Sequence, residues 1–163
     1  MEQNKVKSLK AQMLEARKKS MNLFSDIGHR LESVVVKNGV EWINDSKATS
    51  FSSSVSILKS MSNVYWIVGG LAKKKDKFLL SKNNCKSFKA YIFGKKKNPF
   101  IKELKKVIEY ESFTNLKTLI KKVFLDIKIN KNKNHQTILF SPAAASFDFF
   151  KNFEKRGEYF NSL

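Results

Sequence analysis

The sequence predicts an α/β domain in which a mostly parallel sheet is covered by helices on both faces. Short apolar runs typical of buried strands alternate with stretches of helical periodicity along most of the chain. An Asn38-Gly39 pair separates two segments of period two, which predicts an opening hairpin and one antiparallel strand. With 163 residues, of which 42% are hydrophobic, the chain is long enough for one domain with a sizeable core.

A basic segment precedes the predicted sheet. Val6, Leu9, Met13 and Ala16 recur at helical spacing, which predicts an amphipathic helix with one apolar stripe. We therefore divide the chain into an N-terminal basic helix within residues 1–28 and a domain over residues 29–163.

Strands and helices alternate from residue 31 onward. The predicted strands cover residues 31–37, 40–45, 64–68, 88–93, 108–111 and 136–140. The predicted helices cover residues 49–61, 76–81, 99–107, 115–129 and 146–160. Gly69-Gly70 and Gly94 end two of the strands, and Pro99 lies in the first turn of a helix. Parallel strands joined by helices form a sheet that is buried on both faces.

The net charge of +18 has two interpretations. A nucleic acid or an anionic membrane would attract such a chain. A lysine-biased proteome would give the same excess without selection for a polyanion. Only three of the 32 basic residues are arginines, whereas dedicated nucleic-acid binders usually use Arg for bidentate contacts. We favour a solvated background of lysines and do not expect a nucleic-acid partner.

Several site types are missing from the sequence. Cys85 is the only cysteine, so neither an internal disulfide nor a cysteine metal cluster can form. No apolar run is long enough for a membrane helix, and the start lacks the apolar core of a secretory signal. We therefore expect a cytoplasmic protein without a membrane partner. No P-loop, no G-x-G-x-x-G and no metal-ligand spacing is present, so we expect neither a metal site nor catalytic residues for phosphoryl transfer in this chain.

Three polar loops follow predicted strands. Residues 44–49 combine a carboxylate, an ammonium group and two hydroxyls at a predicted helix N-terminus, which favours an anion site. A plain N-cap at Asp45 or Ser46 is the alternative. In residues 69–73 the paired glycines permit close backbone approach and make Lys73 a candidate cation, although an ordinary turn would also explain them.

The third loop, residues 141–146, consists of small residues that leave space beside a strand end. Ser146, Phe149, Phe150, Phe153 and Gly157 would share one face of the helix predicted after it, with Phe149 and Phe150 packed in the core. Because parallel strands end at the same edge of a sheet, we expect the three loops to converge there.

Five segments resemble, in order and spacing, the C-terminal domain of the D-glutamate-adding Mur ligases (MurD). They are His29-Arg30-Leu31-Glu32, the Gly39–Thr49 string G-V-E-W-I-N-D-S-K-A-T, the Gly69–Lys73 string G-G-L-A-K, and the S-P-A-A-A-S-F-D and N-F-E-K-R-G strings that begin at Ser141 and Asn152. The resemblance covers about residue 29 to residue 163. It departs from the family pattern at Asp26-Ile27-Gly28, at Ala144 and at Lys74-Lys75-Asp76.

The resemblance implies a three-domain cytoplasmic ligase of peptidoglycan biosynthesis, and hence a role in the cell wall, cell shape and cell division. In that family an N-terminal domain holds the UDP-sugar, and a central ATPase domain carries the P-loop and the Mg²⁺ ligands. A Rossmann-like C-terminal domain closes over ATP and brings D-glutamate to the activated carboxylate of UDP-N-acetylmuramoyl-L-alanine. This chain would lack the first two domains, so alone it would not be competent. Separately encoded domains could supply them, and residues 1–28 would be the remnant of a preceding domain or linker.

The resemblance also implies roles for individual residues. The predicted D-glutamate contacts are Thr49, Lys73, Ser146 and Phe153, and the predicted ATP contacts are Arg30, Asp45 and Lys47. Lys73, Thr49 and Ser146 would bind the carboxylates of D-glutamate, with Phe153 beside them. Arg30 and Lys47 would approach the phosphates, and Asp45 the ribose. A dicarboxylate requires an ammonium group and hydroxyl donors, so the chemistry agrees.

A second function remains open from the residues. The chain could be a stand-alone basic binding module that kept this fold and took a nucleic acid or another polyanion as its partner. Steep salt dependence of nucleic-acid binding would support that alternative. The joint presence of Lys73, Thr49 and Ser146 favours the ligase.

Overall fold

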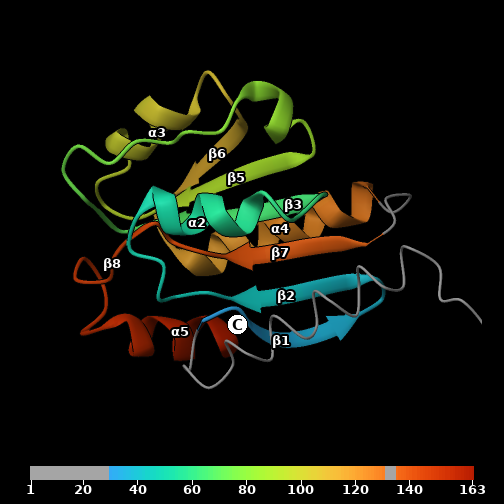
Figure 1. Ribbon diagram of the computed structural model, residues 1–163. Coiled ribbons are helices and arrows are strands. Elements are labelled where there is room, and N and C mark those ends of the chain that lie inside the picture. The colour runs from blue at the N-terminus through green and yellow to red at the C-terminus, as the bar shows by residue number, and fades with distance from the viewer. Residues whose placement is uncertain (1–29, 131–134) are drawn as a thin grey trace, which may run out of the picture.

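The computed structural model describes residues 30–130 and 135–163. They form a six-stranded sheet of order β1-β2-β7-β3-β5-β6 (Figure 1). The strands are β1 (Glu32–Lys37), β2 (Val40–Asn44), β3 (Val64–Gly69), β5 (Phe88–Phe93), β6 (Glu109–Phe113) and β7 (Gln136–Phe140). Only β1 is antiparallel to its neighbour, and the other pairs are parallel. The predicted α/β, Rossmann-like fold is confirmed, whereas the basic helix predicted for residues 1–28 lies outside the described residues.

Helices cover both faces of the sheet, and the sheet separates the hydrophobic core into two halves. The helices are α2 (Phe51–Leu58), α3 (Asn98–Leu104), α4 (Leu116–Ile129) and α5 (Phe153–Asn161). Helices α2 and α3 pack on one face with Trp66 and Val68 of β3. Helices α4 and α5 pack on the other face with Ile67 of the same strand. This division follows from the strand geometry, since successive side chains point to opposite faces.

Local sequence signals set several of the observed boundaries. Asn38 and Gly39 have φ values of 52° and 76°, which suits a two-residue hairpin turn between β1 and β2. Asn115 caps α4 by accepting a hydrogen bond from the backbone N–H of Thr118. Pro99 lies in the first turn of α3, as predicted.

The helix predicted over residues 76–81 is wrong. This segment forms neither a helix nor a strand, and Phe78 and Leu80 are buried with Leu79 80% exposed between them. The backbone N–H of Phe78 points to Glu103 at 3.4 Å instead of closing a helical turn. Phe78 and Leu80 are two residues apart and both side chains are buried in the core. Their burial outweighs the weak helix preference of this short segment. A 3₁₀ helix, η1 (Lys82–Cys85), follows it.

The last helix begins seven residues later than predicted. Asn152 caps α5 by accepting from the backbone N–H of Lys155 at 2.9 Å, so the helix starts at Phe153. Residues 146–152 form turns and bends, and Ser146, Phe149 and Phe150 therefore share no helical face with Phe153 and Gly157. The polar Asn152 cap satisfies an N–H that a longer helix would have bonded internally.

The two predicted core positions in this turn have different outcomes. Phe150 packs against the core on the α4 and α5 face, as predicted. Phe149 is 45% exposed, so its predicted core position is wrong. No helix in the described ranges is long and apolar enough to cross a membrane.

Candidate functional site

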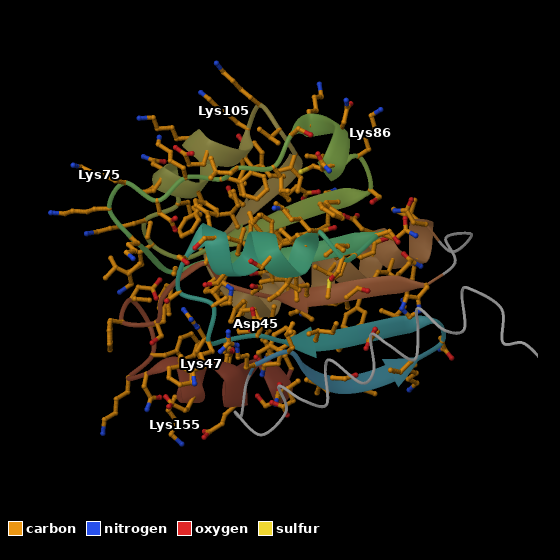
Figure 2. The ribbon with its side chains drawn as sticks, in the orientation of Figure 1. Asp45, Lys47, Lys75, Lys86, Lys105 and Lys155 are labelled. Carbon is orange, nitrogen blue, oxygen red and sulfur yellow. The ribbon has the colours of Figure 1, made fainter. Side chains whose placement is uncertain are left out.

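The three polar loops converge at the carboxyl ends of β2, β7 and β3, which are neighbours in the sheet. Backbone hydrogen bonds join them: Asp45 N donates to Phe140 O at 2.7 Å, and Gly69 N donates to Pro142 O at 2.9 Å. Ala144 N lies 3.3 Å from Ala48 O, its acceptor in the first loop. Figure 2 shows Asp45 and Lys47 at this edge. The predicted convergence is confirmed.

The Gly69-Gly70 pair permits close approach of backbone segments. A Cβ atom on Gly70 would lie 2.7 Å from Ala145 O, and one on Gly69 would lie 2.0 Å from Phe93 O. Both glycines also have positive φ. Directly after them, strand β4 (Leu71–Ala72) pairs antiparallel with β8 (Ala144–Ala145), which the sequence had not predicted. This pairing links the loop that ends in Lys73 to the loop that ends in Ser146.

The residues predicted to bind D-glutamate are distributed over these joined loops and α5. Thr49 and Lys73 are exposed, whereas Ser146 is buried directly after β8. Phe153 is half-buried at the start of α5, where Lys47 Nζ lies 5.6 Å from the centre of its ring. The arrangement presents the Lys73 ammonium group and the Thr49 hydroxyl at one edge of the sheet, which is suitable for an anionic ligand, whereas Ser146 is buried.

Asp45 lies beneath the loops and not on their surface. Its side chain is 3% exposed, and Ser141 Oγ donates to Asp45 Oδ2 at 2.8 Å. Ser54 Oγ lies 2.7 Å from Ser141 Oγ, and Trp66 Nε1 donates to Ser141 O at 2.8 Å. Burial raises the pKa of Asp45 to about 7, against the lowering effects of the Ser141 hydrogen bond and the charge of Arg30. The predicted ribose contact stays a prediction, and in this geometry the carboxylate faces Ser141.

The N-terminus of α2 is capped differently from the prediction. Ser50, and neither Asp45 nor Ser46, is the N-cap residue. The backbone N–H of Phe51 donates to Asp76 Oδ2 at 2.7 Å. A carboxylate of the chain itself therefore occupies part of the expected anion site, so an added anion would rely on Lys73 and the hydroxyls.

Arg156 organises the site and was not among the predicted site residues. It is fully buried, and its guanidinium donates to Ala144 O at 2.9 Å and to Ser46 O at 2.6 Å. Asn44 adds a second tie, since its Nδ2 donates to Gly157 O at 3.0 Å. Burial lowers the pKa of Arg156 to about 10, which leaves it charged at neutral pH. The N-F-E-K-R-G string contains Arg156 and was the sequence signal that could have identified it. The burial of its side chain could not be predicted from the sequence.

Asp148 places another carboxylate at this edge, and both of its oxygen atoms are inaccessible to solvent. Within the described residues, neither carboxylate oxygen of Asp148 accepts a hydrogen bond of normal geometry. Burial raises the pKa of Asp148, and the charges of Arg156 and Lys95 oppose that shift. A Cβ atom on Gly94 would lie 3.1 Å from Asp148 Oδ2, so glycine at this position keeps room for the carboxylate.

Comparison with known proteins identifies relatives of the whole domain. No family model matches the chain. A UDP-N-acetylmuramoylalanine–D-glutamate ligase of Wolbachia sp. subsp. Brugia malayi is 39% identical over 137 residues, which are 84% of this chain and 27% of the relative. Ligases of the same name from Rickettsia felis and Prochlorococcus marinus are 33% and 37% identical over 88% and 89% of this chain.

The chain is a homologue of the C-terminal part of the D-glutamate-adding Mur ligases. It spans about a third of the length of the curated relatives it matches, with 32% of the Rickettsia felis ligase and 31% of the Prochlorococcus marinus ligase covered. The loops that converge in the structure are the segments on which the resemblance to this ligase family rests.

Proposed function

We propose that this chain is the D-glutamate-binding portion of an ATP-dependent amide ligase of peptidoglycan biosynthesis, a UDP-N-acetylmuramoyl-L-alanine:D-glutamate ligase. The observation that carries the proposal is the convergence of three loops, after β2, β3 and β7, that hold the ligase-like strings. Identities of 33–39% to ligases of that name support it.

In this proposal, Lys73, Thr49 and Ser146 bind the two carboxylates of D-glutamate. Lys73 is exposed directly after β4, so its ammonium group can reach a ligand in front of the loops. Charge-assisted hydrogen bonds are the stronger contacts, so Lys73 contributes more than either hydroxyl. Phe153 gives the pocket an apolar wall on the α5 side. Together these groups hold the amine of D-glutamate toward the carboxylate with which it reacts.

The remaining chemistry is assigned to other parts of the ligase. The sequence has no P-loop. In the described residues, no three His, Cys, Asp or Glu side chains lie close enough to hold a metal ion, so we place the Mg²⁺ ligands and the catalytic residues outside this chain. ATP would supply the phosphoryl group that activates the carboxylate. Arg30 is exposed and Lys47 partly exposed near the loops, which suits the proposed phosphate contacts.

The proposed partners and compartment follow from this assignment. The other parts of the enzyme would hold UDP-N-acetylmuramoyl-L-alanine, either in one polypeptide or as separately encoded domains. A precursor ligase of this kind works in the cytoplasm. The relatives reported above are all ligases, which favours this function over the alternative of a stand-alone basic binding module.

A chimeric ligase tests the proposal. Residues 30–163 would replace the homologous part of the Wolbachia relative, and D-glutamate-dependent phosphate release would be measured. We expect turnover, with Lys73→Ala lowering kcat/KM for D-glutamate roughly ten- to a hundredfold and Ser146→Ala about two- to tenfold. The KM for ATP should change little in these two variants. Lys73→Arg should not restore the full kcat/KM for D-glutamate, because the guanidinium side chain is longer and planar.

An unchanged kcat/KM for D-glutamate in Lys73→Ala would show that the pocket lies elsewhere. Lys59→Ala is the matched control, because Lys59 is an exposed lysine in the turn after α2, away from the loops. The control should leave all kinetic constants near those of the parent chimera.

A further inference from the structure

Basic residues are unevenly distributed in the described part of the chain. Residues 73–106 contain thirteen lysines and two acidic residues, a net charge of +11. The other described residues contain eleven basic and nine acidic side chains, a net charge of +2. A lysine-rich composition alone would spread the excess over the whole chain. The basic excess is therefore concentrated in one segment of the described chain.

The loop after β4, η1 and α3, which carry many of these lysines, lie on the same half of the molecule in Figure 1. Lys75, Lys86 and Lys105 extend outward from this side in Figure 2, whereas Asp45 and Lys155 lie on the other half. We call the exposed lysines of residues 73–106 the basic face.

Within residues 30–130 and 135–163, most lysines of the basic face have no acidic partner. Lys77 pairs with Glu103 at 2.9 Å. Lys89 is largely buried against the acidic groups of β6 and α4 and points away from this face. The other eleven lysines of the segment have no ion pair among the described residues. They are Lys73, Lys74, Lys75, Lys82, Lys86, Lys95, Lys96, Lys97, Lys102, Lys105 and Lys106.

The chemistry of the face distinguishes between two kinds of polyanion. Single-stranded nucleic acid is bound by grooves in which bases stack on exposed aromatic rings. All five aromatic residues of the segment are buried: Phe78, Phe88, Tyr91, Phe93 and Phe100. The exposed ring that contacts the face comes from outside the segment: Lys95 Nζ lies 5.2 Å from the ring centre of Phe149. The segment has no arginine, the residue most used for bidentate hydrogen bonds to bases and phosphates. Its one strongly exposed large apolar side chain is Leu79, at 80%, between Lys77 and Lys82 in the chain.

We propose that the basic face binds the surface of an anionic lipid membrane, with the lysines near the headgroups and Leu79 inserted between them. Clustered lysines are attracted to anionic lipids within about a Debye length, and an apolar side chain adds burial at the acyl boundary. Apart from Lys73, the basic face is separate from the D-glutamate contacts. Membrane binding is therefore independent of the proposed ligase function and can be tested on the chain alone.

Vesicle co-sedimentation tests the proposal. The 163-residue chain should bind vesicles of phosphatidylglycerol and phosphatidylcholine at 0.1 M salt, bind pure phosphatidylcholine poorly, and dissociate at 0.5 M salt. Each lysine near the surface contributes roughly fivefold to partitioning. A Lys75→Gln, Lys82→Gln, Lys86→Gln, Lys105→Gln variant should therefore bind several hundredfold more weakly, on the order of 600-fold if the four contributions add. Leu79→Ser should weaken binding further at every salt concentration.

The control removes the same charge elsewhere. Lys59→Gln, Lys117→Gln, Lys121→Gln, Lys151→Gln changes four exposed lysines outside the basic face and should change binding only a few-fold. Circular dichroism and thermal unfolding would show that both variants fold. Equal losses in the two variants would mean that net charge alone drives binding and would overturn the proposal. Absence of vesicle binding, or tighter face-dependent binding to an oligonucleotide than to vesicles, would overturn it as well.

Discussion

At the residue scale, Asp45 couples the stability of the site to pH. The carboxyl ionises near pH 4 in the unfolded chain, but its pKa is about 7 in the folded protein because the group is buried. The folded state therefore binds more protons between these values. The contribution of Asp45 to stability is complete below about pH 4 and is lost as the pH rises through 7.

The Asp45→Asn variant should reveal this dependence. Asn can still accept the Ser141 hydrogen bond but carries no charge. The free energy of unfolding of Asp45→Asn, relative to that of the parent chain, should increase by on the order of 1–3 kcal/mol as the pH rises from 5 to 8. Urea unfolding at both pH values measures the difference. Glu158→Gln, which removes an exposed carboxylate paired with Lys155, is the control and should show little change. A difference that is the same at pH 5 and pH 8 would contradict the assigned pKa.

At the element scale, Arg156 joins α5 to the loops after β2 and β7. Its acceptors are the backbone carbonyls of Ser46 and Ala144, which a substitution cannot remove. Replacing a buried charge by an apolar group is harmless only when its partners are replaced too. Here two buried carbonyls would lose their donors.

Arg156→Met should therefore lower the free energy of unfolding by about 2–4 kcal/mol. In the chimera it should also lower kcat/KM for D-glutamate, because the loop carrying Ser146 loses its tie to α5. Lys155→Met, at the exposed neighbouring position, should cost less than about 0.5 kcal/mol. Urea unfolding of the two variants makes the comparison, and equal stabilities would show that Arg156 does not hold the loops together.

The structure confirms most elements predicted from local patterns and contradicts those that depend on distant partners. The hairpin, the buried strands and the Asn115 start of α4 follow from signals within a few residues. The irregular segment at Phe78 and Leu80 does not, because both side chains pack in the core cluster with residues of α3 and β3. Helix α5 begins later than predicted because Asn152 caps it. The residues before Asn152 also show helical periodicity, so the sequence did not distinguish the two possible start positions.

At the scale of the whole molecule, the described domain is proposed to supply one substrate to chemistry performed elsewhere. We expect the isolated chain, mixed with ATP and UDP-N-acetylmuramoyl-L-alanine, to give no D-glutamate-dependent phosphate release, because the sequence has no P-loop. Adding the remaining parts of a relative as a separate polypeptide should restore slow turnover. The rate would be limited because association is bimolecular without a covalent link. Turnover by the pure chain would refute this division of labour.

The sequence by itself determined the fold class, the strand order along the chain and the loops that carry the ligase-like strings. These properties depend on periodicity, turn residues and short strings, which are local. The tertiary structure decided which loops touch, through the β4 and β8 pairing and the buried guanidinium of Arg156. It also decided that Asp45 is buried beneath the loops. Burial depends on partners that are distant in the sequence, so it becomes visible only when the sheet and its helices are assembled.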